Sequence, residues 1–338
     1  MTLVYFVQSH DAIGQLLRLL ARLREPAGGS LVVVGHDGSR QPIERSQLPA
    51  GDDVLLRQRR EPVRRGELSC LEPYLDAAGW LVDTGIAFDW LIYLSGRDYP
   101  VRPLAAIRRD LAAIPEDGLL RSWPFEAADN PWGQRRTERR YHYCYRAYAE
   151  GWRWPLKLAR PLLRLGRREL SLTYGVHLGA PRRPLPFGPG LVGHGGLQWH
   201  SLRRSAVEYL VAAWREEKPA VAAFRQALVP DEALVQTVLL NAPGLRFRNE
   251  SRRYADTHER PGGHSRVLEL ADYATLTSGD YDFARRFDPV ISGPLLDRLD
   301  RGHTANAGGL LWSTQPCEPH IRLAVVIAWV VVLGLTLI

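Results

Sequence analysis

The sequence predicts an α/β fold built on a mostly parallel sheet. Two observations predict it: short apolar segments with the length of buried strands, and helical segments that alternate with them. The strand-like segments occupy residues 3–8, 31–36, 53–57 and 88–94, and the helical segments occupy 11–24 and 68–82. Such alternation is typical of βαβ units, in which successive strands run in the same direction.

Each element has a local reason. The segments LVYFVQ at 3–8 and LVVVGH at 31–36 are short and apolar, as buried strands are. Between them, Leu and Ile recur at helical spacing over 11–24, with Asp11 near the start of the helix. Three polar turns follow strands, at Ser9–Asp11, His36–Ser39 and Ser95–Asp98. Because ligands of open parallel sheets bind beyond the carboxyl ends of strands, these turns predict a binding site.

The second half of the chain has a different character. Residues 123–190 are rich in Trp, Tyr, Arg and Pro. Helices are predicted at 200–216, 219–228 and 231–240, and residues 280–300 have a mixed pattern that closes in a helix. In the segment from Trp152 to Arg168, Trp and Leu alternate with Arg and Lys, a pattern that fits a membrane-surface helix and an ordinary helix with a solvated basic face equally well.

Composition bounds the class of protein. The chain has 338 residues, 45% hydrophobic and 24% charged, which is globular and excludes a disordered chain. A net charge of +7 and a pI near 9.5 favour anionic partners, although a genome rich in Arg codons explains the same excess. Three widely spaced cysteines, Cys70, Cys144 and Cys317, fit no zinc pattern and no disulfide framework, and they predict a reducing compartment.

The two ends of the chain differ. MTLVYFVQSH lacks the basic flank and long apolar stretch of an export signal. Residues 323–338 carry no charge and fall just short of the roughly 17 apolar residues that a membrane span needs. They predict membrane contact, by a tail anchor or a surface anchor, with a buried strand as the alternative.

Seven segments, in order along residues 3–290, resemble the core-2/I-branching N-acetylglucosaminyltransferase and peptide O-xylosyltransferase family, glycosyltransferase family 14. They are YFVQSHD, GHDGS, VRRGELS, LIYLSGRDYPVRP, GLQWHSLRRSAVEYL, VPDEALVQTVLLNAP and FARRFD. The fourth segment is the most specific. In the third, Arg65 stands where an aromatic residue is usual, and the family's acceptor-side Trp is missing from LRFRNES.

The resemblance implies a GT-A-like glycosyltransferase fold, a Rossmann-type nucleotide-binding half joined to an acceptor half, here with an apolar C-terminal tail. The expected boundaries are 1–122 for the nucleotide-sugar half, 123–190 for an aromatic and basic insert, 191–300 for the acceptor and catalytic half, 301–320 for a linker and 321–338 for a possible membrane anchor. It implies a UDP-sugar donor, carrying N-acetylglucosamine or xylose, and transfer with inversion to a hydroxyl of a glycan, polysaccharide or lipid-linked acceptor.

The motif match assigns roles to single residues. In VPDEALVQTVLLNAP, Glu232 is the expected general base, and its place at a helix start favours the ionised carboxylate. Asp231 is the rival for that role, and it is expected to cap the helix instead.

No metal is implied, and the tripeptide Asp280-Tyr281-Asp282 is interpreted as surface acids. Fixed cations are expected to replace the metal. They are Arg286, at the family's Lys position in FARKF, and Arg266, with Arg260 as its substitute.

The remaining expected site residues contact the donor or the sugar. Asp37 matches the position at the uridine end, His10 lines the same pocket, and Asp98 braces its loop or touches the donor. Gln198, Trp199 and Tyr99 are expected to shape the sugar and acceptor pocket.

The expected location is the cytoplasmic face of a membrane, as in a bacterial-type enzyme. The alternative function is a non-catalytic, membrane-attached module that binds nucleotide or glycan. A nucleic-acid-binding role is not expected, because no recognisable module accompanies the basic charge.

Overall fold

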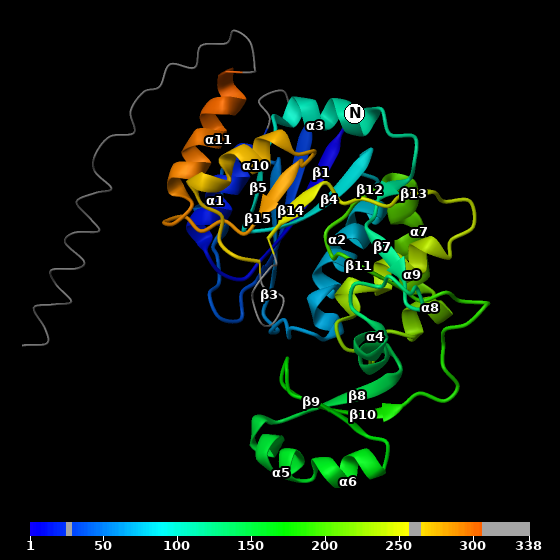
Figure 1. Ribbon diagram of the computed structural model, residues 1–338. Coiled ribbons are helices and arrows are strands. Elements are labelled where there is room, and N and C mark those ends of the chain that lie inside the picture. The colour runs from blue at the N-terminus through cyan, green and yellow to red at the C-terminus, as the bar shows by residue number, and fades with distance from the viewer. Residues whose placement is uncertain (25–28, 257–264, 306–338) are drawn as a thin grey trace, which may run out of the picture.

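A seven-stranded sheet forms the centre of the molecule (Figure 1). The computed structural model describes residues 1–24, 29–256 and 265–305. Four strands are parallel neighbours in the order β4, β1, β2 and β3; their bounds are Trp90–Ser95, Leu3–Ser9, Ser30–Asp37 and Val54–Arg59. Beyond β4, the sheet continues with β12 (Ser201–Arg203), β6 (Gly118–Leu119) and β13 (Phe247–Arg248), of which β12 is antiparallel to both of its neighbours. The predicted parallel α/β sheet is therefore confirmed in its coarse form.

Helices cover both faces of the sheet because successive strand residues point to opposite sides. Val4 and Phe6 of β1 belong to a core shared with α2 (Glu72–Asp83), α7 (Arg204–Arg215) and α9 (Leu234–Leu240). Tyr5 and Val7 belong to the opposite core, which is closed by α1 (Ile13–Leu23), α3 (Leu104–Ala112) and α11 (Gly293–Ala305). The side chains on both faces of β1 are buried from Leu3 to Val7, which explains the unbroken apolar sequence of this segment.

The element predictions hold for the first hundred residues and weaken afterwards. The four expected strands correspond to β1 to β4, and the two expected helices correspond to α1 and α2. The helix expected at 219–228 is confined to α8 (Pro219–Ala222). After α8 the backbone continues in single turns, one of which is closed by the hydrogen bond from Phe224 N to Val221 O. The helix expected at 200–216 begins as strand β12, and α11 runs past the predicted boundary at residue 300.

Two small sheets lie beside the central one. The first pairs β14 (Arg253–Ala255) with β15 (Phe283–Arg285) and β15 with β5 (Asp98–Pro100), and α10 (Tyr273–Ser278) lies between β14 and β15 in the chain. The second pairs β7 (Ser122–Pro124) with β11 (His194–Gly196). The first sheet matters for function, since its register sets Arg285 opposite Asp98.

The predicted insert contains a separate lobe at one end of the molecule (Figure 1). It follows α4 (Gln134–Tyr141) and consists of a three-stranded sheet with two short helices. The strands are β8 (Tyr143–Tyr148), β10 (Val176–Pro181) and β9 (Glu169–Ser171), and the helices are α5 (Arg153–Leu158) and α6 (Arg160–Leu165).

Within the described part of the chain, no helix combines the length and the apolar character needed to cross a membrane. Cys70 and Cys144 are both free thiols. The predicted anchor at 321–338, together with Arg260 and Cys317, lies outside the described residues.

Candidate active site

A cavity of about 1210 Å³ opens at the carboxyl ends of β1, β2 and β4. All three predicted polar turns contribute to its lining, through Gln8 to Asp11, Asp37, and Ser95 to Arg97. The chain proceeds from β1 to β2 and β3 on one side and then crosses to β4 on the other, so the cavity lies where the strand order reverses. Ligands of doubly wound sheets bind at such a point.

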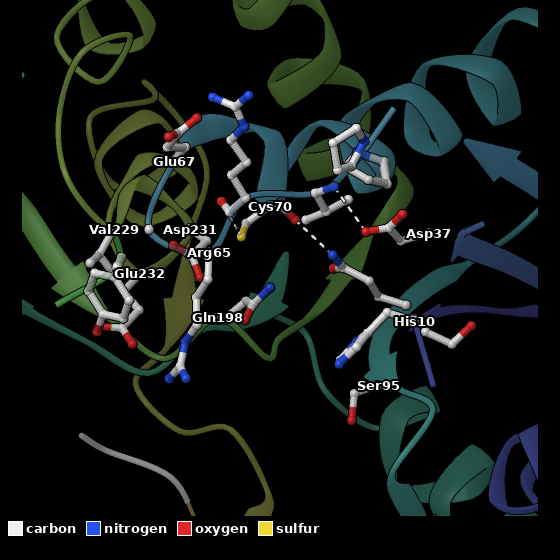
Figure 2. A pocket seen from close by; sticks show the side chains of 18 of the residues that line it. His10, Asp37, Arg65, Glu67, Cys70, Ser95, Gln198, Val229, Asp231 and Glu232 are labelled. Atoms are coloured by element: carbon white, nitrogen blue, oxygen red, sulfur yellow. Dashed lines mark hydrogen bonds between the residues drawn. The ribbon is translucent and has the colours of Figure 1, made fainter. Parts of the chain in front are cut away.

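Figure 2 shows acidic side chains on two sides of this cavity. Asp231 and Glu232 lie at one side and Asp37 lies with His10 at the other, with Arg65 and Gln198 between them. Six of the predicted site residues therefore line one cavity: Glu232, Asp37, His10, Gln198, Trp199 and Arg286.

Beneath the cavity, a chain of hydrogen bonds fixes its floor. Gln198 Nε2 donates to the Tyr93 hydroxyl at 2.8 Å, this hydroxyl donates to Gln8 Oε1, and Gln8 Nε2 donates to the Cys70 carbonyl at 2.9 Å. Burial raises the pKa of the Tyr93 hydroxyl well above its usual value, so this group stays a neutral donor. A satisfied buried network of this kind holds Gln198 in one orientation.

Asp37 ends β2 and is oriented by backbone amides. Its Oδ1 accepts from Ser39 N at 3.0 Å, and its Oδ2 accepts from Val63 N at 2.9 Å. Burial raises the pKa of Asp37, but the hydrogen bonds from Ser39 and Val63 outweigh burial and leave this pKa below its usual value. His10 is exposed, and its Nε2 lies 3.5 Å from Asp11 Oδ2.

Glu232 is held by a buried arginine. Its Oε2 accepts a hydrogen bond from Arg140 Nη1 at 2.8 Å, and the side chain of Arg140 is 8% exposed against 35% for Glu232. The Arg140 guanidinium also lies 4.8 Å from the centre of the Trp132 ring. A cation fixed in this way holds the carboxylate in one orientation.

The turn that carries Glu232 is locally strained. Val229 adopts a left-handed conformation with φ of 55°, and Pro230–Glu232 form a single 3₁₀ turn before α9. A branched residue in this conformation costs about 1–3 kcal/mol and persists only where neighbours fix it. Here Val229 N donates to Gly66 O at 2.8 Å, and the Tyr141 hydroxyl donates to Val229 O at 3.1 Å.

Asp231 does not cap a helix, contrary to the expectation. Neither the 3₁₀ turn nor α9 has a side-chain cap, and Asp231 Oδ1 is buried without a hydrogen-bond partner among the described residues. Burial, and then the neighbouring Glu232 carboxylate, raise the pKa of Asp231 to about 7. The two adjacent carboxyl groups therefore differ in environment: one is paired with a cation, and the other is desolvated.

The cavity is rich in arginine. Arg253 and Arg285 come from the β14–β15 strand pair, and Arg286 follows directly after it. The guanidinium of Arg285 lies 4.1 Å from the Trp199 ring centre, and its Nε lies 3.5 Å from Asp98 Oδ1. Across the described ranges, the Nε atoms of Arg253, Arg285 and Arg286 are buried without a hydrogen-bond partner. Three arginines at one cavity suit a polyanionic ligand.

Three expected site residues do not line the cavity. Asp98 is buried, and it braces the loop by accepting from Ser95 N at 3.0 Å and from Ser95 Oγ at 2.6 Å. The Tyr99 ring lies in the core beside Phe287, and its hydroxyl donates to Asp300 at 2.7 Å, because alternation in β5 turns it away from the cavity. Arg266 donates to Asp256 Oδ2 at 2.7 Å and also to Asp272, so two carboxylates already occupy its guanidinium.

The Asp-x-Asp tripeptide also lies outside the cavity lining. Asp280 is exposed, but Asp282 is buried, so its interpretation as a surface acid was wrong. Asp282 Oδ1 lies 3.1 Å from Arg102 Nη1, and Asp280 Oδ1 lies 3.6 Å from the same atom. Burial raises the pKa of Asp282 to about 6. In the described ranges, no group of three or more His, Cys, Asp and Glu side chains has the geometry of a metal site.

Sequence reasoning missed several residues of the site. Arg65 stands out in the sequence only as a departure from an aromatic position, yet it lines the cavity, with its guanidinium 5.3 Å from the Tyr174 ring centre. Arg140 has no sequence signal, because it reaches Glu232 from a distant segment, and Trp132 contributes by stacking on Arg140. Arg253 lines the cavity from β14, whose short strand has no recognisable pattern.

No protein-family model matches the chain. Individual relatives do match it. Xylosyltransferase 2 of Rattus norvegicus is 26% identical over 258 residues, which cover 70% of this chain and 26% of the rat protein. Xylosyltransferase 2 of Homo sapiens is 25% identical over 323 residues, covering 88% of this chain and 33% of the human protein. The β-glucuronosyltransferase GlcAT14B of Arabidopsis thaliana is 25% identical over 313 residues, covering 88% of this chain and 65% of the plant protein.

These relatives agree with the resemblance inferred from the seven segments. The chain is a homologue of xylosyltransferases and β-glucuronosyltransferases, consistent with glycosyltransferase family 14. It spans about a quarter to a third of the length of the xylosyltransferases.

Proposed function

We propose that this homologue of xylosyl- and glucuronosyltransferases moves a sugar from a UDP-sugar to a hydroxyl acceptor, with inversion and without a metal. One observation carries the proposal: Glu232, Asp37 and Arg286 line a single cavity at the point where the strand order reverses. Acidic and basic groups from segments far apart in the chain thus meet where doubly wound proteins bind their ligands.

The donor would lie across the sheet edge. Asp37, whose carboxylate is oriented by two backbone amides, would contact the uridine end. The diphosphate would lie against Arg285 and Arg286, which both line the cavity. Guanidinium groups form bidentate contacts with phosphate and would stabilise the charge that develops on the departing UDP, which is the task of a metal in other enzymes.

Glu232 would be the general base. The acceptor oxygen attacks the anomeric carbon from the face opposite UDP, and its proton passes to the Glu232 carboxylate. As the new carbon–oxygen bond forms, the bond to the β-phosphate oxygen breaks, and its electron pair leaves with UDP. The Arg140 contact fixes the orientation of the Glu232 carboxylate.

The cavity volume of about 1210 Å³ exceeds the roughly 300–1,000 Å³ of ordinary ligand sites, which supports binding of a nucleotide-sugar together with part of an acceptor. N-acetylglucosamine and xylose are the proposed sugars, and the names of the plant relatives add glucuronic acid. The acceptor would be a glycan, a polysaccharide or a lipid-linked sugar.

Incubation with UDP-xylose, UDP-N-acetylglucosamine and UDP-glucuronic acid tests the proposal. Release of UDP, alone and with added glycan acceptors, is measured in excess chelator. We expect thermal stabilisation by UDP, slow hydrolysis of one donor, and faster turnover with an acceptor, none of it reduced by the chelator. Activity that is lost in chelator and restored by Mn²⁺ would overturn the metal-free proposal.

A non-catalytic nucleotide- or glycan-binding module is the second candidate. It would bind UDP with the same arginines and would neither hydrolyse nor transfer any donor. The Asp231 carboxyl beside Glu232 argues against it, because a cavity-lining carboxyl group whose pKa is raised to about 7 by burial is typical of a catalytic site.

A further inference from the structure

The lobe ends in two helices that bury none of their residues. In α5 and α6 no side chain is buried, and the exposed fractions of Trp154, Leu158, Leu162 and Leu165 are 66%, 77%, 71% and 81%. Isolated exposed leucines are ordinary, but a contiguous apolar row on a soluble surface signals an interaction site. Figure 1 shows α5 and α6 at the outer edge of the molecule, beyond the β8–β10–β9 sheet.

These four residues share one face. The helical backbone continues through the junction, since Ala159 N donates to Pro155 O at 3.0 Å and Leu163 N donates to Ala159 O at 2.9 Å. Along a helix, steps of four, four and three residues return to nearly the same direction. Leu156 and Leu163 lie on the opposite face and are only partly exposed, so the outward row has no partner among the described residues.

Basic side chains flank this row. Six stand between residues 152 and 168, with no acidic residue among them: Arg153, Lys157, Arg160, Arg164, Arg167 and Arg168. Arg153 pairs with Glu150 at 2.7 Å, and within the described chain the other five form no ion pair. Lys157 lies 4.8 Å from the Trp154 ring centre, which places a cation beside the aromatic edge of the row.

We propose that the face formed by Trp154, Leu158, Leu162 and Leu165 docks on an anionic lipid bilayer. A row of Leu and Trp flanked by unpaired Arg and Lys matches the interfacial layer, where apolar side chains enter the acyl boundary and cations meet lipid phosphates. A nucleic acid would leave the leucines exposed, and it is therefore the poorer match.

The lobe that carries this face also contributes to the cavity. Residues 147–150, shortly before α5, line the cavity, and Tyr174 to His177 line it from the neighbouring strand, where Val176 lies opposite Tyr148. If the proposed transfer is correct, an acceptor held at the lipid surface is thereby presented beside the donor. The docking itself does not depend on catalysis.

Vesicle co-flotation of the full chain tests the docking. Vesicles of phosphatidylcholine alone are compared with vesicles that also contain phosphatidylglycerol, at low and high salt. We expect binding to the anionic vesicles that weakens with salt, by roughly fivefold for each basic side chain that salt screens from the lipid phosphates. The variant Trp154→Ser/Leu158→Ser/Leu162→Ser/Leu165→Ser should bind at least about tenfold more weakly, with its affinity for UDP unchanged.

The matched control is Val290→Ser/Ile291→Ser. It removes exposed apolar side chains just before α11, which lies far from α5 and α6 in Figure 1, and it should bind vesicles like the parent chain. Equal binding by the fourfold variant, or binding indifferent to vesicle charge, would overturn the proposal and point to the segment at 323–338. The proposal would also be overturned if the parent chain formed dimers without lipid and the fourfold variant did not, since the face would then be a dimer interface. Release of the parent chain from the vesicles by added RNA would overturn it as well.

Discussion

Arg140 Nη1 lies 2.8 Å from Glu232 Oε2, although 92 residues separate the two side chains in sequence. Arg140 is buried and stacked on Trp132, so its guanidinium is fixed in place and determines the position of the Glu232 carboxylate. Together with the strained backbone at Val229, this contact sets the Glu232 carboxylate at the cavity wall. The arrangement fits a general base that must point at one acceptor oxygen.

Glu232→Gln should abolish transfer while UDP still binds. The amide oxygen can still accept the Arg140 hydrogen bond, so the fold is kept, whereas the proton acceptor is removed. Loss of a general base typically costs about 100- to 10,000-fold in kcat. Turnover and UDP affinity are measured together. Glu208→Gln on α7, where Glu208 pairs with Arg204 at 2.7 Å outside the cavity lining, is the control and should keep full activity.

The variant Asp231→Asn tests which of the two adjacent carboxyl groups, Asp231 or Glu232, is the general base. If Glu232 is the base, this variant keeps transfer within about tenfold of the parent, since general-base losses are larger. A loss as deep as that of Glu232→Gln would move the base assignment to Asp231, whose pKa near 7 suits proton transfer at neutral pH.

Asp231 should also make the free energy of unfolding depend on pH. Its pKa is raised to about 7 in the folded state, against about 3.9 for an unfolded Asp, so the folded state holds the proton more tightly between these values. Stability contributed by this group therefore falls as pH rises from about 4 to about 7. Asp231→Asn lacks this loss, so its Tm should match the parent near pH 4 and exceed it near pH 8.

Thermal melts of both proteins across this range measure the difference. Asp282, with its own pKa raised to about 6, and the buried His200, with its pKa lowered to about 3, contribute equally to both proteins and cancel. A Tm difference that stays constant with pH would show that Asp231 does not titrate in this window.

Arg286→Ala and Arg266→Ala should have opposite consequences. The first removes a cavity cation and should weaken UDP binding by about 10- to 100-fold, the range of a charged hydrogen bond. The second removes a guanidinium already held by Asp256 and Asp272, so UDP binding should stay the same while stability falls by about 1 kcal/mol or less. Calorimetry with UDP and thermal melts distinguish the two. A large loss of UDP affinity in Arg266→Ala would restore Arg266 as a donor contact.

Tyr99→Phe should affect the core and leave the cavity unchanged. It deletes the hydroxyl that donates to Asp300 at 2.7 Å, at a cost of about 1 kcal/mol in the free energy of unfolding. The KM for the UDP-sugar should not change, because the ring packs beside Phe287 away from the cavity. An increased KM at unchanged stability would return Tyr99 to the sugar pocket.

The first four strands and two helices were predictable because their signals are local. Apolar runs such as LVYFVQ need only short-range periodicity to be recognised, and the turns that follow them mark the binding edge of any parallel sheet. The later helix at 219–228 was overestimated, since propensity alone does not show where packing against α9 ends it.

What the sequence determined by itself was the family resemblance, the parallel α/β sheet and the candidates Glu232, Asp37 and Arg286, all of which depend on motifs and on order along the chain. The tertiary structure alone decided which candidates meet. In the folded chain, Tyr99 lies in the core and Arg266 is bound by the carboxylates of Asp256 and Asp272. Arg140, from a segment that no motif covers, binds Glu232. The physical reason is that side-chain direction and ion pairing depend on neighbours remote in sequence, and only the folded chain brings these neighbours into contact.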